Sequence, residues 1–170
     1  MNNIFEIKPT TINDVPLVLS FIRELAKYEK LLDEVVATEE ILRETLFGDK
    51  AHAEVIIGYL NKTPVSFALY FHNFSTFLGR PGIYLEDLFV KESARGKSIG
   101  RKMLAYLANL AKERKCGRLE WWVLDWNETA ILFYKRLGAK AMDDWTVFRL
   151  TDKALDELAD KWDDNNSTCS

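Results

Sequence analysis

The sequence has little histidine and little cysteine, and these shortages exclude several kinds of site. Only two histidines (His52 and His72) and two cysteines (Cys116 and Cys169) occur among 170 residues. The cysteines are far apart and lack the spacing of a metal or redox motif, and two histidines are too few for a typical zinc site. We therefore expect no metal, and a cytoplasmic protein with reduced thiols.

Long apolar runs and an excess of positive charge are also missing. No segment is long and apolar enough to cross a bilayer, and the opening MNNIFEIKPT lacks the charged and apolar regions of a secretory signal. Lys and Arg total 23 against 26 Asp and Glu, which gives a net charge of −3. General nucleic-acid affinity requires a broad basic face. We therefore expect neither nucleic acid nor a membrane as a partner.

What the sequence does contain is a succession of strand-like and helix-like segments. Hydrophobic residues make up 48% of the chain, enough for a sizeable core. Alternating and helical apolar spacing first predicts strand 4–9, a helix after Asn13 or Asp14 and a helix after Thr38. Strands 52–60, 64–74 and 83–90 follow, and then helix 100–115. The predicted order ends with strand 118–124, a helix from about residue 128 that Gly138 ends, strand 145–150, helix 153–162 and a frayed tail. This order predicts a mixed α/β domain over residues 1–150, with a central, mostly antiparallel sheet and helices on both faces. Residues 151–170 are then a peripheral helix and tail.

A basic, glycine-containing loop precedes the helix predicted over 100–115. It reads Arg95-Gly96-Lys97-Ser98-Ile99-Gly100 and is followed by Arg101. A helix amino terminus exposes unpaired N–H groups and a partial positive charge, so this loop fits a phosphate or pyrophosphate. The pattern is not a nucleoside-triphosphate P-loop, and it fits a dinucleotide fingerprint poorly. The alternative is a solvated turn in which Ser98 caps the helix.

Two motifs, in this order, resemble a known superfamily. The loop follows an apolar strand, and LDWNETAILFYKRLGAK later supplies an asparagine, a helix and a tyrosine. Together they resemble the GNAT superfamily of acyl-CoA-dependent N-acetyltransferases. Four segments resemble the diamine/polyamine (spermidine/spermine) branch of this superfamily: ELAKYEK, IYLEDLFV, VLDWN and FYKRLGA. The segments FSTFLGRPGIYLEDL and VLDWN most resemble the thialysine N-epsilon-acetyltransferases.

The resemblance covers about residues 4–150 and carries implications for fold and ligands. It implies a GNAT-type fold, acetyl-CoA as co-substrate, a small cationic amine as substrate and a homodimer. One departure is Ser98, which stands where the family usually has glycine. Its Cβ would restrict the backbone or crowd the pyrophosphate, whereas its hydroxyl would suit a phosphate oxygen. We expect somewhat weakened cofactor affinity at most.

The resemblance assigns the catalytic roles to Glu86 and Tyr134. An alkylammonium, with a pKa of about 10.4, must lose its proton before it attacks, and Glu86 would accept that proton through a water. Burial or the neighbouring Asp87 is expected to raise the pKa of Glu86. A regular strand would point these two carboxylates to opposite faces, but GNAT enzymes have a distortion here that frees a backbone amide for the thioester carbonyl. Tyr134, with a phenol pKa near 10, would protonate the departing thiolate.

The resemblance also implies a set of binding residues. The pantetheine arm is expected along the backbone of Leu88, Phe89 and Val90, and the pyrophosphate at the loop residues Arg95, Gly96, Lys97, Ser98, Ile99, Gly100 and Arg101. Asn127, Tyr134 and Lys135 complete the cofactor set. The substrate set consists of Tyr28, Glu29, Glu86, Asp87 and Trp145.

Plainer interpretations of the same residues remain open. Glu86 and Asp87 also fit sheet-edge charges, and Lys135 also fits a solvated helix face. Tyr28 and Tyr134 also fit packed helix aromatics. Acetylation of protein lysines or amino termini, and an acyl-CoA-binding sensor without turnover, are the functional alternatives. Only Ser98 supports the sensor.

Overall fold

The computed structural model describes residues 4–166, which form two compact units. The first unit ends at Trp122 and contains the sheet, and the second begins at Val123. The strands are β1 (Phe5–Pro9), β2 (Glu54–Leu60), β3 (Thr63–Ser75), β4 (Arg80–Val90) and β5 (Leu119–Trp121). The helices are α1 (Val15–Glu29), α2 (Glu39–Phe47), α3 (Ile99–Glu113), α4 (Glu128–Arg136) and α5 (Asp152–Asn166), with short 3-10 turns η1 (Ile12–Asp14), η2 (Leu32–Glu34) and η3 (Glu92–Ala94).

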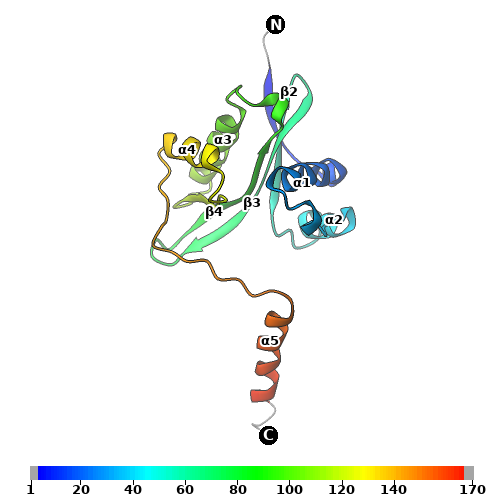
Figure 1. Cartoon of the computed structure of the whole chain (residues 1–170), viewed down its shortest axis with the longest axis vertical. Coiled ribbons are helices and arrows are strands. Elements are labelled where there is room, and N and C mark those ends of the chain that lie inside the picture. The colour runs from blue at the N-terminus through cyan, green and yellow to red at the C-terminus, as the bar shows by residue number, and fades with distance from the viewer. Residues whose placement is uncertain (1–3, 167–170) are drawn as a thin grey trace. The chain divides into compact units, whose positions relative to one another are not determined.

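The five strands of the first unit form one sheet in the order β1-β2-β3-β4-β5. The first four strands pair antiparallel, and β5 pairs parallel to β4. Figure 1 shows α1 and α2 on one face of this sheet and α3 on the other. The predicted mixed, mostly antiparallel sheet with helices on both faces is therefore confirmed. The basic loop lies between the end of β4 and the start of α3.

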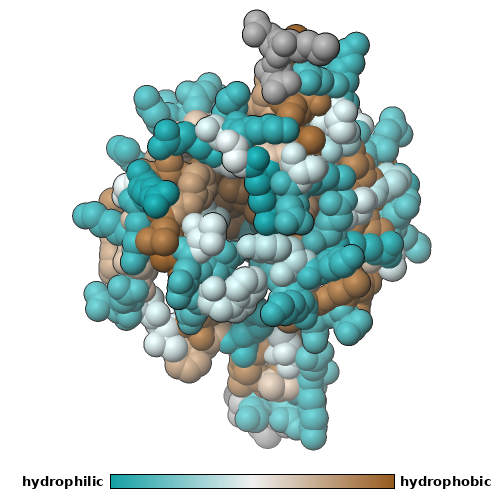
Figure 2. Space-filling view, turned by 45° about the horizontal axis from the view of Figure 1, so that its top comes forward, coloured by the Kyte–Doolittle hydropathy of each residue, from teal (hydrophilic) through white to brown (hydrophobic). Residues whose placement is uncertain are grey.

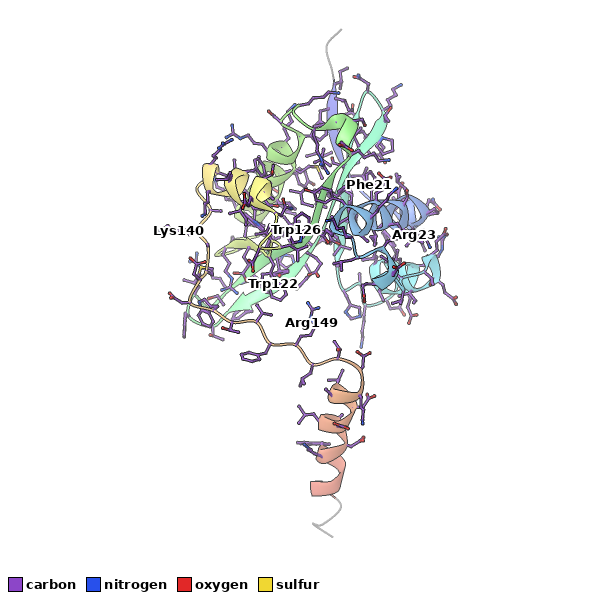
Figure 3. All side chains as sticks on the ribbon, viewed as in Figure 1. Phe21, Arg23, Trp122, Trp126, Lys140 and Arg149 are labelled. Atoms are coloured by element: carbon purple, nitrogen blue, oxygen red, sulfur yellow. The ribbon has the colours of Figure 1, made fainter. Side chains whose placement is uncertain are left out.

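Aromatic packing attaches α1 to the middle of the sheet. Phe21, which is labelled in Figure 3, is fully buried and stacks on Phe67 of β3 with ring centroids 5.3 Å apart. Phe89 of β4 packs edge-on against the ring of Phe21, with ring centroids 6.5 Å apart. Burying a phenylalanine contributes about 2–3 kcal/mol, so this cluster fixes the position of α1 over β3 and β4.

The predicted starts of the first two helices are confirmed, although their caps differ. The Thr38 hydroxyl accepts a hydrogen bond from the N–H of Ile41 at 3.2 Å and caps α2. Asp14 is the N-cap residue of α1, but its carboxylate accepts hydrogen bonds from the N–H and hydroxyl of Thr11 at 2.7 and 2.9 Å. The carboxylate of Asp14 thus stabilises the turn η1 before the helix.

Towards the carboxyl end, two predicted elements differ in length and one predicted strand is absent. The strand predicted over 118–124 is limited to β5, and 145–150 form no strand. A strand requires a neighbour for its backbone hydrogen bonds, and no described segment of the second unit provides one. The last helix continues through Asn166 instead of fraying after 162, because no glycine or proline interrupts it. The rest of the predicted tail, 167–170, lies outside the described residues.

Candidate functional site

The strand β4 is irregular at Glu86. Leu85 pairs with Tyr70 and Asp87 pairs with Leu69, so two steps along β4 correspond to one step along β3. Glu86 is the extra residue and is exposed, as expected for a bulge that interrupts the ladder. The predicted distortion of this strand is therefore present.

The bulge decides which way Asp87 faces. Residues directly opposite each other on antiparallel strands share a face, so Asp87 lies on the face of Leu69, which packs against the core beneath α1. Leu85 shares the face of Tyr70, whose hydroxyl reaches Glu54 beside Arg114, the C-cap residue of α3. Without the extra residue, positions 85 and 87 would face the same way. The extra residue therefore directs Asp87 towards α1.

Asp87 is partly buried near two other carboxylates, and this environment changes its pKa. Burial, followed by the negative charges of Glu86 and Glu29, raises the pKa of Asp87 to about 7. Burial also raises the pKa of Glu29, the last residue of α1. Because these three carboxylates repel one another, binding of a cation beside them is electrostatically favourable.

The basic loop adopts a backbone shape that is unusual for a serine. Gly96 has φ 75°, and Ser98 has φ 59° and ψ 17°, so both residues are in the left-handed region. Ser98 is the N-cap residue of α3, but its side chain makes no capping hydrogen bond. The interpretation of Ser98 as a side-chain cap is therefore wrong. A left-handed conformation favours glycine, which explains why glycine is the usual residue of the family at this position.

The loop residues divide into those whose side chains point into the protein and those that are exposed. Ile99 is 2% exposed, so only its backbone is available to a ligand. Gly96, Lys97, Ser98 and Arg101 are exposed. The ammonium of Lys97 lies 3.4 Å from the carbonyl of Ser93, within the loop itself. Gly100 lies in the first turn of α3, where N–H groups lack intrahelical partners.

Arg95 is also exposed, but its side chain has specific partners. Its Nε donates to the carbonyl of Val90 at 3.1 Å, and its guanidinium lies over the ring of Tyr28 at 4.6 Å. Phe89 lies 6.0 Å from the same guanidinium. Tyr28 and Arg95 were predicted to belong to two different sites, the amine site and the coenzyme loop. No sequence motif links them, because their contact depends on how α1 crosses β4.

The first unit therefore gathers one group of the predicted residues around the end of β4. Glu29, Glu86 and Asp87 interact through their charges, while Tyr28, Phe89, Val90 and Arg95 are joined by direct contacts. Leu88 is partly buried and pairs with Ala68. The contacts within this group were not predicted from the sequence.

The second unit holds the remaining predicted residues. The amide oxygen of Asn127 accepts from the N–H of Ala130 at 3.2 Å and caps α4, so the NH2 group takes no part in this cap. Tyr134 is partly buried on α4, with its ring 5.4 Å from that of Phe133, and Lys135 is exposed. Gly138 follows α4 with φ 88°, as predicted for a helix end. Trp145 is 70% exposed and lies outside regular structure.

A hollow lies on the first unit, away from the end of β4. Its volume is about 190 Å³, and residues of β1, α2, β2, β3 and the C-terminal half of α3 line it. Arg114 and Glu54 form a bidentate ion pair at its edge, in which Nη2 donates to Oε2 at 2.7 Å. None of the predicted site residues lines this hollow.

Neither a metal cluster nor a membrane span is found in the part of the chain that the structure describes. Residues 4–166 contain no group of three or more His, Cys, Asp or Glu side chains arranged to hold a metal ion. Within the same residues, every helix is too short or too polar to cross a bilayer.

Comparison with known proteins agrees with this geometry. Residues 21–139 match the sequence profile of the acetyltransferase (GNAT) family. The chain is 39% identical over 155 residues to a thialysine N-epsilon-acetyltransferase of Bos taurus, covering 85% of this chain and 91% of that protein. It is 30% identical over 165 residues to a spermidine/spermine N(1)-acetyltransferase-like protein of Homo sapiens, covering 91% of this chain and 24% of that protein.

A solved structure extends the likeness to three dimensions. An integron cassette protein from the mobile metagenome of V. cholerae superimposes with a TM-score of 0.77 at 32% identity, covering 91% of this chain and 97% of that one. GNAT enzymes use acetyl-CoA as their co-substrate. The chain therefore belongs to the GNAT acetyltransferase family, with thialysine and polyamine N-acetyltransferases among its relatives, and is an enzyme that transfers acetyl groups.

Proposed function

We propose that this enzyme transfers an acetyl group from acetyl-CoA to the primary amine of a small cationic substrate, namely a diamine, a polyamine or a thialysine-like amino acid. The observation that carries the proposal is the path of the chain along β4, which leads from the bulge at Glu86 to Val90 and then, through the short turn η3, into the left-handed, basic loop before α3. The names of the relatives support the substrate class. The raised pKa of Asp87 supports a cationic substrate, because an approaching ammonium relieves the repulsion among the carboxylates.

The loop fits the coenzyme through its backbone and its charge. Gly96 and Ser98 turn the chain so that successive N–H groups and the start of α3 can surround an anion. Lys97 and Arg101 are exposed beside it and add positive charge. Leu88, Phe89 and Val90 offer strand backbone for the pantetheine arm, and Asn127 and Lys135 are assigned to the arm and to a phosphate. Bound acetyl-CoA supplies the acetyl thioester.

The chain's own groups move two protons in the proposed reaction. Glu86 accepts one proton from the substrate ammonium through a water, which gives the nitrogen the lone pair that it needs for attack. A backbone amide released by the bulge would stabilise the negative charge that develops on the carbonyl oxygen. The nitrogen gives up its second proton to water as Tyr134 gives its proton to the departing thiolate, so the products are a neutral acetamide and the free thiol, and Tyr134 regains its proton from solvent. Trp145, Tyr28 and Glu29 are proposed to line the amine path.

A turnover assay with a panel of amines tests this proposal. Release of free thiol is followed with putrescine, spermidine, thialysine and a lysine peptide, after an acetyl-CoA titration has established binding. We expect turnover with at least one small amine, and a Glu86→Gln variant with a slower rate at neutral pH and a shifted pH–rate profile. Acetylation of the peptide alone would favour a protein acetyltransferase. Binding without turnover on any amine would contradict the proposal.

We propose further that the enzyme is a cytoplasmic homodimer. Apolar side chains at the turn between β3 and β4 support an interface: Phe77 is 95% exposed, and Phe74 and Leu78 are also exposed. Figure 2 shows hydrophobic side chains reaching the surface in patches among hydrophilic ones. Large exposed apolar groups gathered at one place are typical of protein–protein contacts. Light scattering during gel filtration measures the mass; a monomer at high concentration would contradict the proposal.

A further inference from the structure

The side chain of Arg95 turns back onto the protein instead of extending from the loop. Its Nε donates to the carbonyl of Val90 at 3.1 Å, and its guanidinium lies 4.6 Å from the ring centroid of Tyr28. The rings of Tyr28 and Phe89 are themselves 6.4 Å apart, so the guanidinium lies against an aromatic pair. Three segments meet at this one side chain: the last turn of α1, the end of β4 and the basic loop.

This arrangement distinguishes Arg95 from the other basic residues of the loop. A guanidinium that binds a phosphate presents two N–H groups of its fork to the oxygens. Here the Nε is already directed to a backbone carbonyl, and the ring of Tyr28 covers one side of the plane. Arg101, by contrast, is exposed in the first turn of α3. These contacts use the Nε and one face of the guanidinium, so they give Arg95 a structural role whatever its Nη groups bind.

The tie leads to the carboxylates of the proposed amine site. Tyr28 immediately precedes Glu29, whose charge contributes to the raised pKa of Asp87. Phe89, the other ring beneath the guanidinium, is two residues beyond Asp87 on β4. A shift of the loop would therefore displace α1 and β4 at the positions that hold the two acids.

We propose that Arg95 is a positioning residue whose stack on Tyr28 holds the acetyl-CoA loop in its binding shape and couples that loop to the Glu29–Asp87 pair. The inference rests on the proposed function for the identity of the two ligands. The coupling is reciprocal: if bound acetyl-CoA increases the affinity for the amine through this contact, the bound amine increases the affinity for acetyl-CoA by the same factor. The expected result is that acetyl-CoA binds more weakly when Tyr28 loses its ring, although Tyr28 itself belongs to the amine side.

A double-mutant cycle on acetyl-CoA affinity tests the tie. Calorimetric titrations without amine compare Arg95→Gln, Tyr28→Leu and the double variant with the parent protein. We expect each single variant to weaken binding about tenfold, and the double variant to be no weaker than either. Arg95→Lys keeps the charge but loses the planar stack, so it should behave like Arg95→Gln, whereas Tyr28→Phe keeps the ring and should restore affinity.

Tyr59 provides a matched control, because Lys8 lies over its ring at 5.4 Å in an unrelated cation–aromatic pair on β1 and β2. Tyr59→Leu should leave acetyl-CoA affinity unchanged. Arg101→Gln should weaken binding and also reduce its dependence on salt, which Tyr28→Leu should not do.

Two results would overturn the inference without affecting the proposed function. One is normal acetyl-CoA affinity in Tyr28→Leu together with weak binding in Arg95→Gln. The other is additive losses in the double variant. Either result would show that Arg95 affects acetyl-CoA binding independently of Tyr28. A parent protein that binds no acetyl-CoA would instead refute the proposed function, and the coupling with it.

Discussion

The carboxyl of Asp87 should make the stability of the enzyme depend on pH in an unusual direction. Its pKa rises from the ordinary value of 3.8 to about 7, so between these values the folded chain holds a proton that the unfolded chain has released. The free energy of unfolding should therefore fall as pH rises, by about 1.4 kcal/mol for each pH unit in this window. In a comparison of about pH 5.5 with about pH 8, roughly 1.5 pH units lie below the pKa of Asp87 in the folded chain. The free energy of unfolding should therefore fall by about 2 kcal/mol over this range.

The substitution Asp87→Asn isolates this contribution, because asparagine does not titrate. Urea unfolding of the parent and the variant at both pH values gives the difference in unfolding free energy. Between the lower and the higher pH, the unfolding free energy of the variant should rise by about 2 kcal/mol relative to that of the parent. Asp49→Asn, at an exposed position after α2, is the matched control for the loss of one carboxylate. Glu29→Gln should move the transition to lower pH, because it removes one of the charges that raise the pKa of Asp87. A difference between parent and Asp87→Asn that stays constant with pH would refute the reasoning.

Three further predictions concern the loop, the core edge and the leaving group. Ser98→Gly should stabilise the fold by up to about 1 kcal/mol in thermal unfolding. Left-handed geometry costs a serine about 1–2 kcal/mol, and relieving this strain is partly offset by the larger backbone entropy that glycine loses on folding. A loss of stability would contradict the assigned geometry. Arg114 lowers the pKa of Glu54, so this pair stabilises the fold above the ordinary glutamate pKa and loses its effect as pH falls through the lowered value. Because the pair is partly exposed, Glu54→Gln should cost about 1 kcal/mol at neutral pH and little in acid, as urea unfolding will test. Tyr134→Phe should reduce turnover about a hundredfold with acetyl-CoA affinity nearly unchanged, and equal turnover would remove its role as the acid.

The sheet and most helices were predictable because their signals are local. Val18, Phe21 and Leu25 recur at helical spacing, and all three are buried on α1. The turn Asn61-Lys62 joins β2 to β3 with positive φ at both residues, as an asparagine-led two-residue turn allows. Such features depend on a few neighbouring residues and are therefore visible in the sequence itself.

The failures arose where structure depends on distant partners. Residues 145–150 have the alternation of a strand, but alternation does not supply a neighbour, and the segment remains irregular with Trp145 exposed. The bulge at Glu86 could be expected only from the family resemblance, because no local residue type demands it. The stacking of Arg95 on Tyr28 was not predictable, since it requires α1, β4 and the loop to be assembled first. Motifs could thus nominate candidate site residues, while the contacts between their side chains required the fold.

A crystal structure of the enzyme with bound acetyl-CoA tests the central claim most directly. The account predicts the diphosphate against the backbone N–H groups of residues 96–100, the pantetheine arm along Leu88–Val90, and the sulfur close to both Glu86 and Tyr134. A coenzyme that leaves this loop empty, or that places its sulfur away from either side chain, would contradict it.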